Sequence, residues 1–181
     1  MIEITQARND RDLAGILSLQ RQNLAVNLSP EEVASQGFVT VVHDLEILRR
    51  MNDAVPHTIA KDGDLVVGYA LTMLPGFRTE IPVLFSLFER LDELQWKGTL
   101  LSELSYYVIG QVCVAKECRG MGVFDQLYEG VKSFNAERFD AVATEISSRN
   151  TRSLRAHERI GFETLLKFKD EESGEDWVIV G

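Results

Sequence analysis

The residues best suited to chemistry lie between positions 112 and 124. The apolar run Val112-Cys113-Val114 leads into Arg119-Gly120-Met121-Gly122-Val123-Phe124, whose two glycines permit unusual backbone angles and a close approach. A helical apolar stripe starts directly after this turn, so the first amides of the helix have no internal partner. The helix dipole adds partial positive charge there. The segment therefore predicts an anion site suited to a pyrophosphate, although two glycines can also simply shape a strand–helix turn.

Two familiar phosphate-binding patterns are excluded by the residues that follow the turn. Gly120-x-Gly122 lacks the third glycine of a dinucleotide fingerprint, because position 125 is Asp. No Gly-Lys-Ser/Thr sequence follows either, so the turn is not a P-loop.

A second polar segment, residues 150–162, reads Asn-Thr-Arg-Ser-Leu-Arg-Ala-His-Glu-Arg-Ile-Gly-Phe. Together with the first segment it resembles the GNAT family of acyl-CoA-dependent N-acetyltransferases. The family's first motif, Arg/Gln-x-x-Gly-x-Gly/Ala, is matched at Arg119 and Gly122, whereas Phe124 replaces the small last residue. Its second motif, Asn-x-x-Ala/Ser-x-x-x-Tyr-x-x-x-Gly-Phe, is matched at Asn150, Ser153, Gly161 and Phe162, with His157 at the tyrosine position.

The resemblance implies that acetyl-CoA is the cosubstrate. Because no further Cys and no His at ligand spacing surrounds Cys113 and Cys118, we expect no metal site. In the family the amides of the first motif hold the coenzyme A pyrophosphate, and the preceding strand pairs with pantetheine like an added strand. We expect one arginine of the second segment, Arg155 or Arg152, to steer or pair with a coenzyme phosphate. The predicted coenzyme-binding residues are Val112, Cys113, Val114, Arg119, Gly120, Met121, Gly122, Val123, Phe124, Asn150, Ser153 and Arg155.

The family reaction is a direct attack by a free amine on the thioester, so the amine loses a proton and the departing thiolate gains one. His157 stands where the family places its usual thiolate acid, and histidine titrates near neutrality. Glu145, an acid in a segment expected to be buried, is the candidate general base. Cys113 as an acyl-enzyme nucleophile is a weaker rival, because buried cysteines usually only pack. Other candidate bases are Glu103, Tyr106 and Tyr107.

Two strands and two helices must position these residues. Tyr106–Val114 is apolar on both alternating faces and predicts a central strand, with Gly110 marking a bulge. Helical spacing predicts a helix from about 122 to 138, then a strand over 141–146 and a short helix over 153–160 that ends at Gly161. The resemblance implies that strands 106–114 and 141–146 are a central parallel pair that splays apart to admit acyl-CoA.

The rest of the chain predicts a frame of strands and helices around that pair. Ile2–Ala7 and 38–42 are strand-like, and Asn9 or Asp10 and Asp44 are helix N-caps. An Asp-Gly pair predicts a hairpin between 57–60 and 65–74. A helix over 81–94 falls in an inserted excursion at about 75–103, and the closing strands are expected at 162–168 and 177–180. We expect one domain over 1–181, of the α/β (α+β) class, with a mixed sheet of about seven strands.

Composition sets the remaining limits. The 181 residues carry a net charge of −9, which argues against general nucleic-acid binding. A chain of this length can fold without disulfides or metal, and its two cysteines suggest free thiols in a reducing compartment. No signal peptide or membrane-length apolar run is evident, so we expect a cytoplasmic protein that does not bind membranes.

The sequence thus predicts an N-acetyltransferase that moves an acetyl group to a primary amine. A small-molecule amine is the first choice of acceptor, and a protein N-terminus or lysine is the second. A non-catalytic acyl-CoA-binding module and transfer of a longer acyl group stay open, as does a homodimer.

Overall fold

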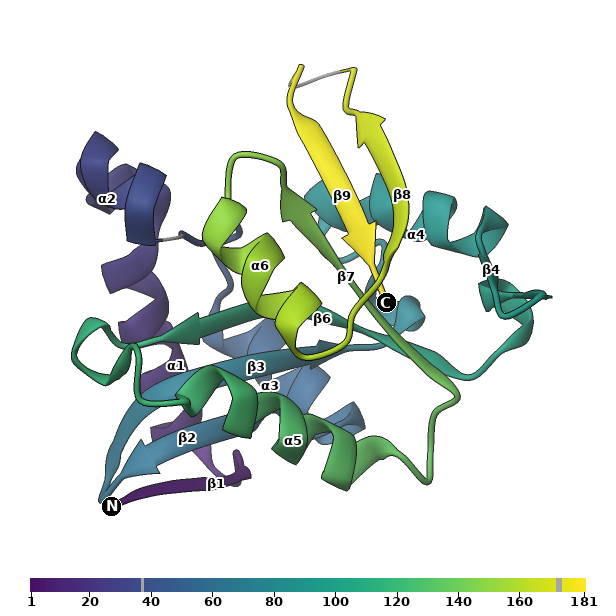
Figure 1. The fold of residues 1–181 in the computed structure, drawn as a ribbon. Helices are drawn as coiled ribbons and strands as arrows, with labels where there is room; N and C mark the ends of the chain where they lie inside the picture. The colour runs from purple at the N-terminus through teal and green to yellow at the C-terminus, as the bar shows by residue number, and fades with distance from the viewer. Residues whose placement is uncertain (37, 172–173) are drawn as a thin grey trace.

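The computed structural model describes residues 1–36, 38–171 and 174–181, which form a twisted mixed sheet with helices on both faces (Figure 1). In their order across the sheet, its seven strands are β1 (Ile2–Gln6), β2 (Thr58–Asp62), β3 (Leu65–Met73), β6 (Tyr106–Val114), β7 (Ala141–Ser147), β9 (Asp176–Val180) and β8 (Thr164–Lys169). The helices are α1 (Asp10–Asn23), α2 (Pro30–Gln36), α3 (Leu45–Ala54), α4 (Phe85–Glu93), α5 (Val123–Asn135) and α6 (Thr151–Arg159).

The central strands β6 and β7 are the parallel pair of this sheet, and they separate part-way along. Their ladder joins residues 106–108 to 141–143 and extends no further. Just beyond it, the Thr144 hydroxyl donates to the carbonyl of Ile109 at 2.7 Å. β7 then pairs on its other side with β9. The predicted splayed pair in a mixed seven-stranded sheet is therefore confirmed.

A bulge in β6 lies where the splay begins. The register against β3 pairs Gln111 with Leu71 but Ile109 with Thr72, so Gly110 is the extra residue. The bulge changes which side chains face which layer. Before it, Ile109 packs against α5; after it, Gln111 is hydrogen-bonded to the α1 residue Gln20.

Helices α1, α3 and α4 cover one face of the sheet, and α5 and α6 cover the other (Figure 1). The α5 stripe that includes Leu127 and Val131 is buried against the sheet. Close packing there depends on Gly130, because a Cβ at this position would lie 2.6 Å from the Ile4 side chain. None of the described helices is long and apolar enough to cross a membrane.

Local signals placed several boundaries correctly. Asn9 and Asp44 cap α1 and α3 by accepting hydrogen bonds from the amides of Asp12 and Ile47. Gly63, with φ +60°, forms the predicted hairpin turn.

The excursion at 75–103 differs from the single helix expected over 81–94. The helix begins only at Phe85, after a 3-10 turn over Pro82–Leu84, and it is followed by a small hairpin, β4 (Gln95–Trp96) and β5 (Thr99–Leu100). Segment 38–42 is likewise not a full strand, since only Val39 makes a bridge, to Leu24.

Candidate active site

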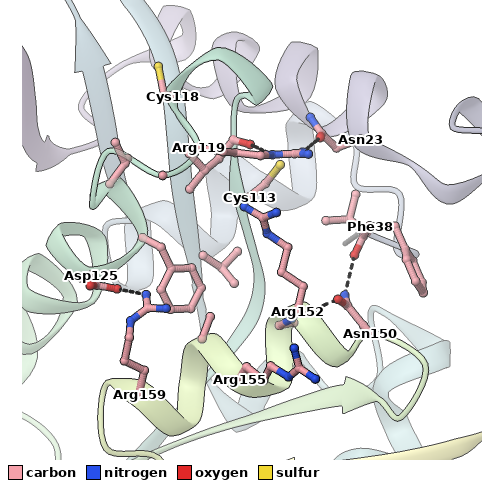
Figure 2. A pocket seen from close by; sticks show the side chains of 18 of the residues that line it. Asn23, Phe38, Cys113, Cys118, Arg119, Asp125, Asn150, Arg152, Arg155 and Arg159 are labelled. Carbon is pink, nitrogen blue, oxygen red and sulfur yellow. Dashed lines mark hydrogen bonds and ion pairs between the residues drawn. The ribbon is translucent and has the colours of Figure 1, made fainter. Parts of the chain in front are cut away.

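A cleft of about 790 Å³, the large cleft, opens on the α5–α6 side of the splay (Figure 2). Its walls are the second half of β6, the turn before α5, the start of α5 and one side of α6. Segment 38–39 and the end of α1 close it from the other side. The predicted coenzyme residues that line it are Val112, Cys113, Val114, Arg119, Gly120, Gly122, Val123, Phe124, Asn150, Ser153 and Arg155. Met121 belongs to the turn but does not line the cleft, and its side chain is exposed.

The glycine turn presents open backbone to the large cleft. Gly120 and Gly122 have φ of +78° and +75°, which is strained for any residue with a Cβ. Within the described part of the chain, no side chain forms a capping hydrogen bond at the start of α5. The first amides of α5 and the positive end of its dipole are therefore positioned to receive an anion.

The Arg119 guanidinium ties the turn to α1. Its Nε donates to the carbonyl of Val114 at 3.1 Å, and its Nη2 donates to Oδ1 of Asn23 at 2.6 Å (Figure 2). Asn23 in turn donates to the carbonyl of Leu19. The arginine of the first motif thus fixes the turn relative to the end of α1.

Positive charge gathers in the large cleft of an otherwise acidic protein. Arg119, Arg152, Arg155 and Arg159 line it, against one carboxylate, Asp125, which pairs with Arg159. Arg152 reaches from α6 across the cleft toward β6 (Figure 2). This local charge suits a phosphorylated ligand.

Asn150 organises the opposite wall. Its Oδ1 accepts from the Ser153 amide at 3.2 Å and so caps α6, while its Nδ2 donates to the carbonyl of Phe38 at 3.3 Å. The asparagine of the second motif therefore holds both α6 and segment 38–39 in place around the cleft.

His157 lies behind the cleft wall rather than in it, with 1% of its surface exposed. Its Nδ1 lies 2.8 Å from the carbonyl of Ser153, so Nδ1 carries the proton, and Nε2 accepts from the Tyr128 hydroxyl at 2.6 Å. Burial lowers the pKa of His157 to about 4. The Phe124 ring packs against the His157 imidazole and the Tyr128 ring, with ring centroids 5.1 and 5.0 Å apart. Its side chain therefore fills the contact between α5 and α6.

Glu145 lies in the splayed part of β7. Because side chains alternate along a strand, it faces the same side as Ala143, toward α4, and not the side of the large cleft. Burial raises the pKa of its carboxyl to about 7; Arg90 opposes this shift and Asp170 adds to it. Such a carboxyl exchanges its proton near neutral pH.

The other sequence candidates have less suitable surroundings. Burial raises the pKa of the Cys113 thiol to about 12, which leaves little thiolate for an acyl-enzyme mechanism. Burial likewise raises the pKa of Tyr106 and of Tyr107 to about 12. Glu103 is exposed, outside the lining of the large cleft.

Among the cleft residues that sequence reasoning did not assign to the coenzyme, three lie far from both motifs in the sequence: Asn23, Phe38 and Val39. Each comes from the first quarter of the chain and reaches the site only through the fold. Among the described residues, no three His, Cys, Asp or Glu side chains are grouped so that they could hold a metal ion.

Comparison with protein-family models gives one match, to the GNAT acetyltransferase family over residues 25–162, which is most of the chain. The chain belongs to the GNAT family of acetyltransferases. It is an acyltransferase, and its acyl donor is acetyl-CoA. No curated protein sequence matches it significantly.

Solved GNAT-like structures share the fold at low identity. A chain of the NatC complex bound to Gag peptide and CoA is 16% identical, with a TM-score of 0.65 over 99% of this chain and 96% of that one. Salmonella typhimurium yncA, solved with acetyl-CoA, is 17% identical, with a TM-score of 0.63 over 99% of this chain and 91% of that one. Arabidopsis thaliana Naa50, solved with the bisubstrate analogue CoA-Ac-MVNAL, is 15% identical, with a TM-score of 0.62 over 99% of this chain and 97% of that one.

Proposed function

We propose that this GNAT protein binds acetyl-CoA in the large cleft and transfers the acetyl group to the primary amine of a small molecule. The observation that carries the proposal is the meeting of both family motifs around one basic cleft at the splay. The amides at Gly120–Val123 would hold the pyrophosphate, and Arg152 or Arg155 would pair with a phosphate. The backbone of β6 at Val112–Val114, beyond its ladder with β7, would pair with the pantetheine amides.

In the transfer, the amine nitrogen forms a bond to the thioester carbonyl carbon and the carbon–sulfur bond breaks. Glu145 is our candidate for the group that takes the amine proton, directly or through water. Its raised pKa supports this role, because a base works best when its pKa is close to the working pH.

The departing thiolate must gain a proton, and the Tyr128–His157 pair is our candidate source. His157 has its own N–H engaged with Ser153, so the mobile proton of the pair is that of the Tyr128 hydroxyl. His157 would then act as a positioning residue that orients this hydroxyl.

A protein N-terminal amine is the second candidate acceptor. It is favoured by the likeness to the NatC chain and to Naa50, which were solved with a peptide and with a peptide-bearing analogue. At 16% and 15% identity, that likeness extends to the fold alone.

The test is to incubate the protein with acetyl-CoA and a panel of small amines and free-N-terminus peptides, measuring thiol release and product mass. The proposal predicts amine-dependent thiol release with acetylated small amines. Release with peptides alone would favour the second candidate. Tight acetyl-CoA binding without release for any amine would indicate a non-catalytic binding module.

A further inference from the structure

A second cleft, of about 430 Å³, lies on the other face of the splay, where α3 and α4 cover the sheet. We refer to it as the small cleft. It is bounded by residues 40–44, by Ile47 of α3 and by residues 80–82 before α4. Its volume is within the range of sites that hold small molecules.

The two clefts share one wall. Phe38 and Val39 line the large cleft, whereas the next five residues, 40–44, line the small one. Phe38 is held by Asn150, which follows β7, and Val41 is held by Gln111 of β6, so segment 38–41 passes across the opening between β6 and β7. An amine in the small cleft would approach this opening from the face opposite to the large cleft, and a direct attack requires that its nitrogen reach the thioester carbonyl carbon there.

Segment 38–44, the wall between the clefts, is fixed to the bulge in β6 by the buried side-chain amides of Gln111 and Gln20. Gln111, next to Gly110, donates from Nε2 to the carbonyl of Val41 at 2.9 Å, so its Oε1 is the acceptor for the Tyr69 hydroxyl and for Nε2 of Gln20. Gln20 Oε1 accepts from the His43 amide. The position of segment 41–43 is therefore fixed by hydrogen bonds to β6, one of the two strands that splay apart.

The same hydrogen bonds fix the charge of His43. Because Gln20 Oε1 accepts from a backbone amide, Gln20 Nε2 is the donor, and it lies 2.9 Å from Nδ1 of His43. Nδ1 therefore carries no proton and the imidazole is neutral, in agreement with burial, which lowers the pKa of His43 to about 4. The small cleft contains no positive charge from this residue.

The lining of the small cleft is mainly apolar with an acidic rim. Val42, Ile47 and Ile81 supply apolar surface. Of its two carboxylates, Glu80 is paired with Arg50, whereas Asp44 is exposed and caps α3. Among the described residues that line it there is no Lys or Arg. A protonated amine on an apolar skeleton matches this lining, and a polyanion does not.

We propose that the small cleft binds the amine acceptor, and that the acceptor is a small monoamine with an apolar carbon skeleton. This inference rests on the proposed acetyl transfer and names its substrate class. Val42 would contact the skeleton, and Asp44 would attract the ammonium group during approach.

The test uses hexylamine, ethanolamine and a short peptide with a free N-terminus as probes. Thiol release gives kcat/KM for each, and calorimetry on protein saturated with CoA gives the Kd of hexylamine without turnover. Val42→Lys adds a positive charge at a side chain that is 68% exposed, and Leu65→Lys is its matched control, 66% exposed and outside both clefts. Asp44→Asn removes the charge and keeps a good N-cap.

We expect hexylamine to exceed ethanolamine and the peptide in kcat/KM by about tenfold or more. Val42→Lys should weaken hexylamine binding by about tenfold and leave the KM for acetyl-CoA within about twofold, while Leu65→Lys changes neither. Asp44→Asn should weaken hexylamine binding a few-fold.

Equal effects of the two lysine variants, or a preference for ethanolamine or the peptide, would overturn the inference while leaving acetyl transfer in place. Val42-sensitive hexylamine binding without thiol release for any amine would instead refute the proposed function and keep the binding site.

Discussion

Arg119 and Asn23 are joined by a 2.6 Å hydrogen bond between Nη2 and Oδ1, although they lie 96 residues apart. The bond connects the turn that precedes α5 to the last residue of α1. Through it, the backbone of the proposed pyrophosphate site is positioned by a helix on the other side of the sheet.

Asn23→Ala should therefore weaken acetyl-CoA binding by about tenfold, or ~1.4 kcal/mol, because the turn loses its anchor on α1. Calorimetric titration measures this loss. Arg119→Ala should weaken acetyl-CoA binding more than Asn23→Ala does, and the double variant should bind little more weakly than Arg119→Ala alone. Additive losses would show that the two residues act independently.

Glu145 should give the reaction a base whose protonation limits the rate in mild acid. With its pKa raised to about 7, kcat/KM should fall about tenfold per pH unit below pH 7. Glu145→Gln should be slow and lose this inflection. Asp170→Asn should shift the inflection to lower pH, because a like charge that raises the pKa is removed. An unchanged profile in Glu145→Gln would exclude this residue.

Tyr128→Phe tests the proton source for the thiolate with a minimal change of volume. We expect kcat to fall by about 100-fold with little change in the KM for acetyl-CoA. Tyr107→Phe is the control, since Tyr107 is also buried on the α5 face of the sheet. Stopped-flow thiol release should separate the two variants; equal rates would remove Tyr128 from the mechanism.

Acid should destabilise the fold through three buried histidines. Burial lowers the pKa of His43, His57 and His157 to about 4, below the ordinary value of 6.5, so the unfolded chain binds more protons between these limits. Their contribution to stability is complete above about pH 6.5 and is lost as the pH falls toward 4. Glu145 acts in the opposite direction, because its raised pKa favours the protonated folded state below pH 7.

Compared with the folded chain, the unfolded chain binds about three more protons at the histidines and about one fewer at Glu145, a net difference of about two protons. The free energy of unfolding should therefore fall by about 2.7 kcal/mol per pH unit as the pH decreases near pH 5.5. Urea unfolding at pH 7.5, 6.5 and 5.5 measures the slope. His57→Asn should reduce it, because one buried histidine is removed. Equal stability at pH 6.5 and 5.5 would contradict the assignment.

The sequence predicted the centre of the fold well because its signals there are local. Tyr106–Val114 is apolar on both faces and matches β6 residue for residue. Gly110 marked the bulge, and the N-caps at Asn9 and Asp44 are short-range hydrogen bonds. The resemblance carried by the two motifs predicted that β6 and β7 would be a parallel pair that splays apart, as the structure shows.

Features that depend on tertiary contacts could not be predicted. Arg119 was expected at the phosphate site, but only the fold shows its bond to Asn23. The proton positions on His157 depend on Tyr128, which is 29 residues away. Segment 38–42 has a strand-like composition, yet its backbone bonds with Asn150 and Gln111 instead of with a full strand.

The most direct test of the proposed coenzyme site is calorimetric titration with acetyl-CoA of the wild type, Gly120→Val and Gly63→Val. Both glycines have positive φ, +78° and +60°, and a Cβ added at either would meet no atom within 4 Å, so the backbone strain of the two substitutions is matched. Of the two, only Gly120 lines the large cleft. We expect the wild type and Gly63→Val to bind alike and Gly120→Val to bind at least about tenfold more weakly. No binding by the wild type, or equal losses in both variants, would contradict the assignment of this turn to the coenzyme.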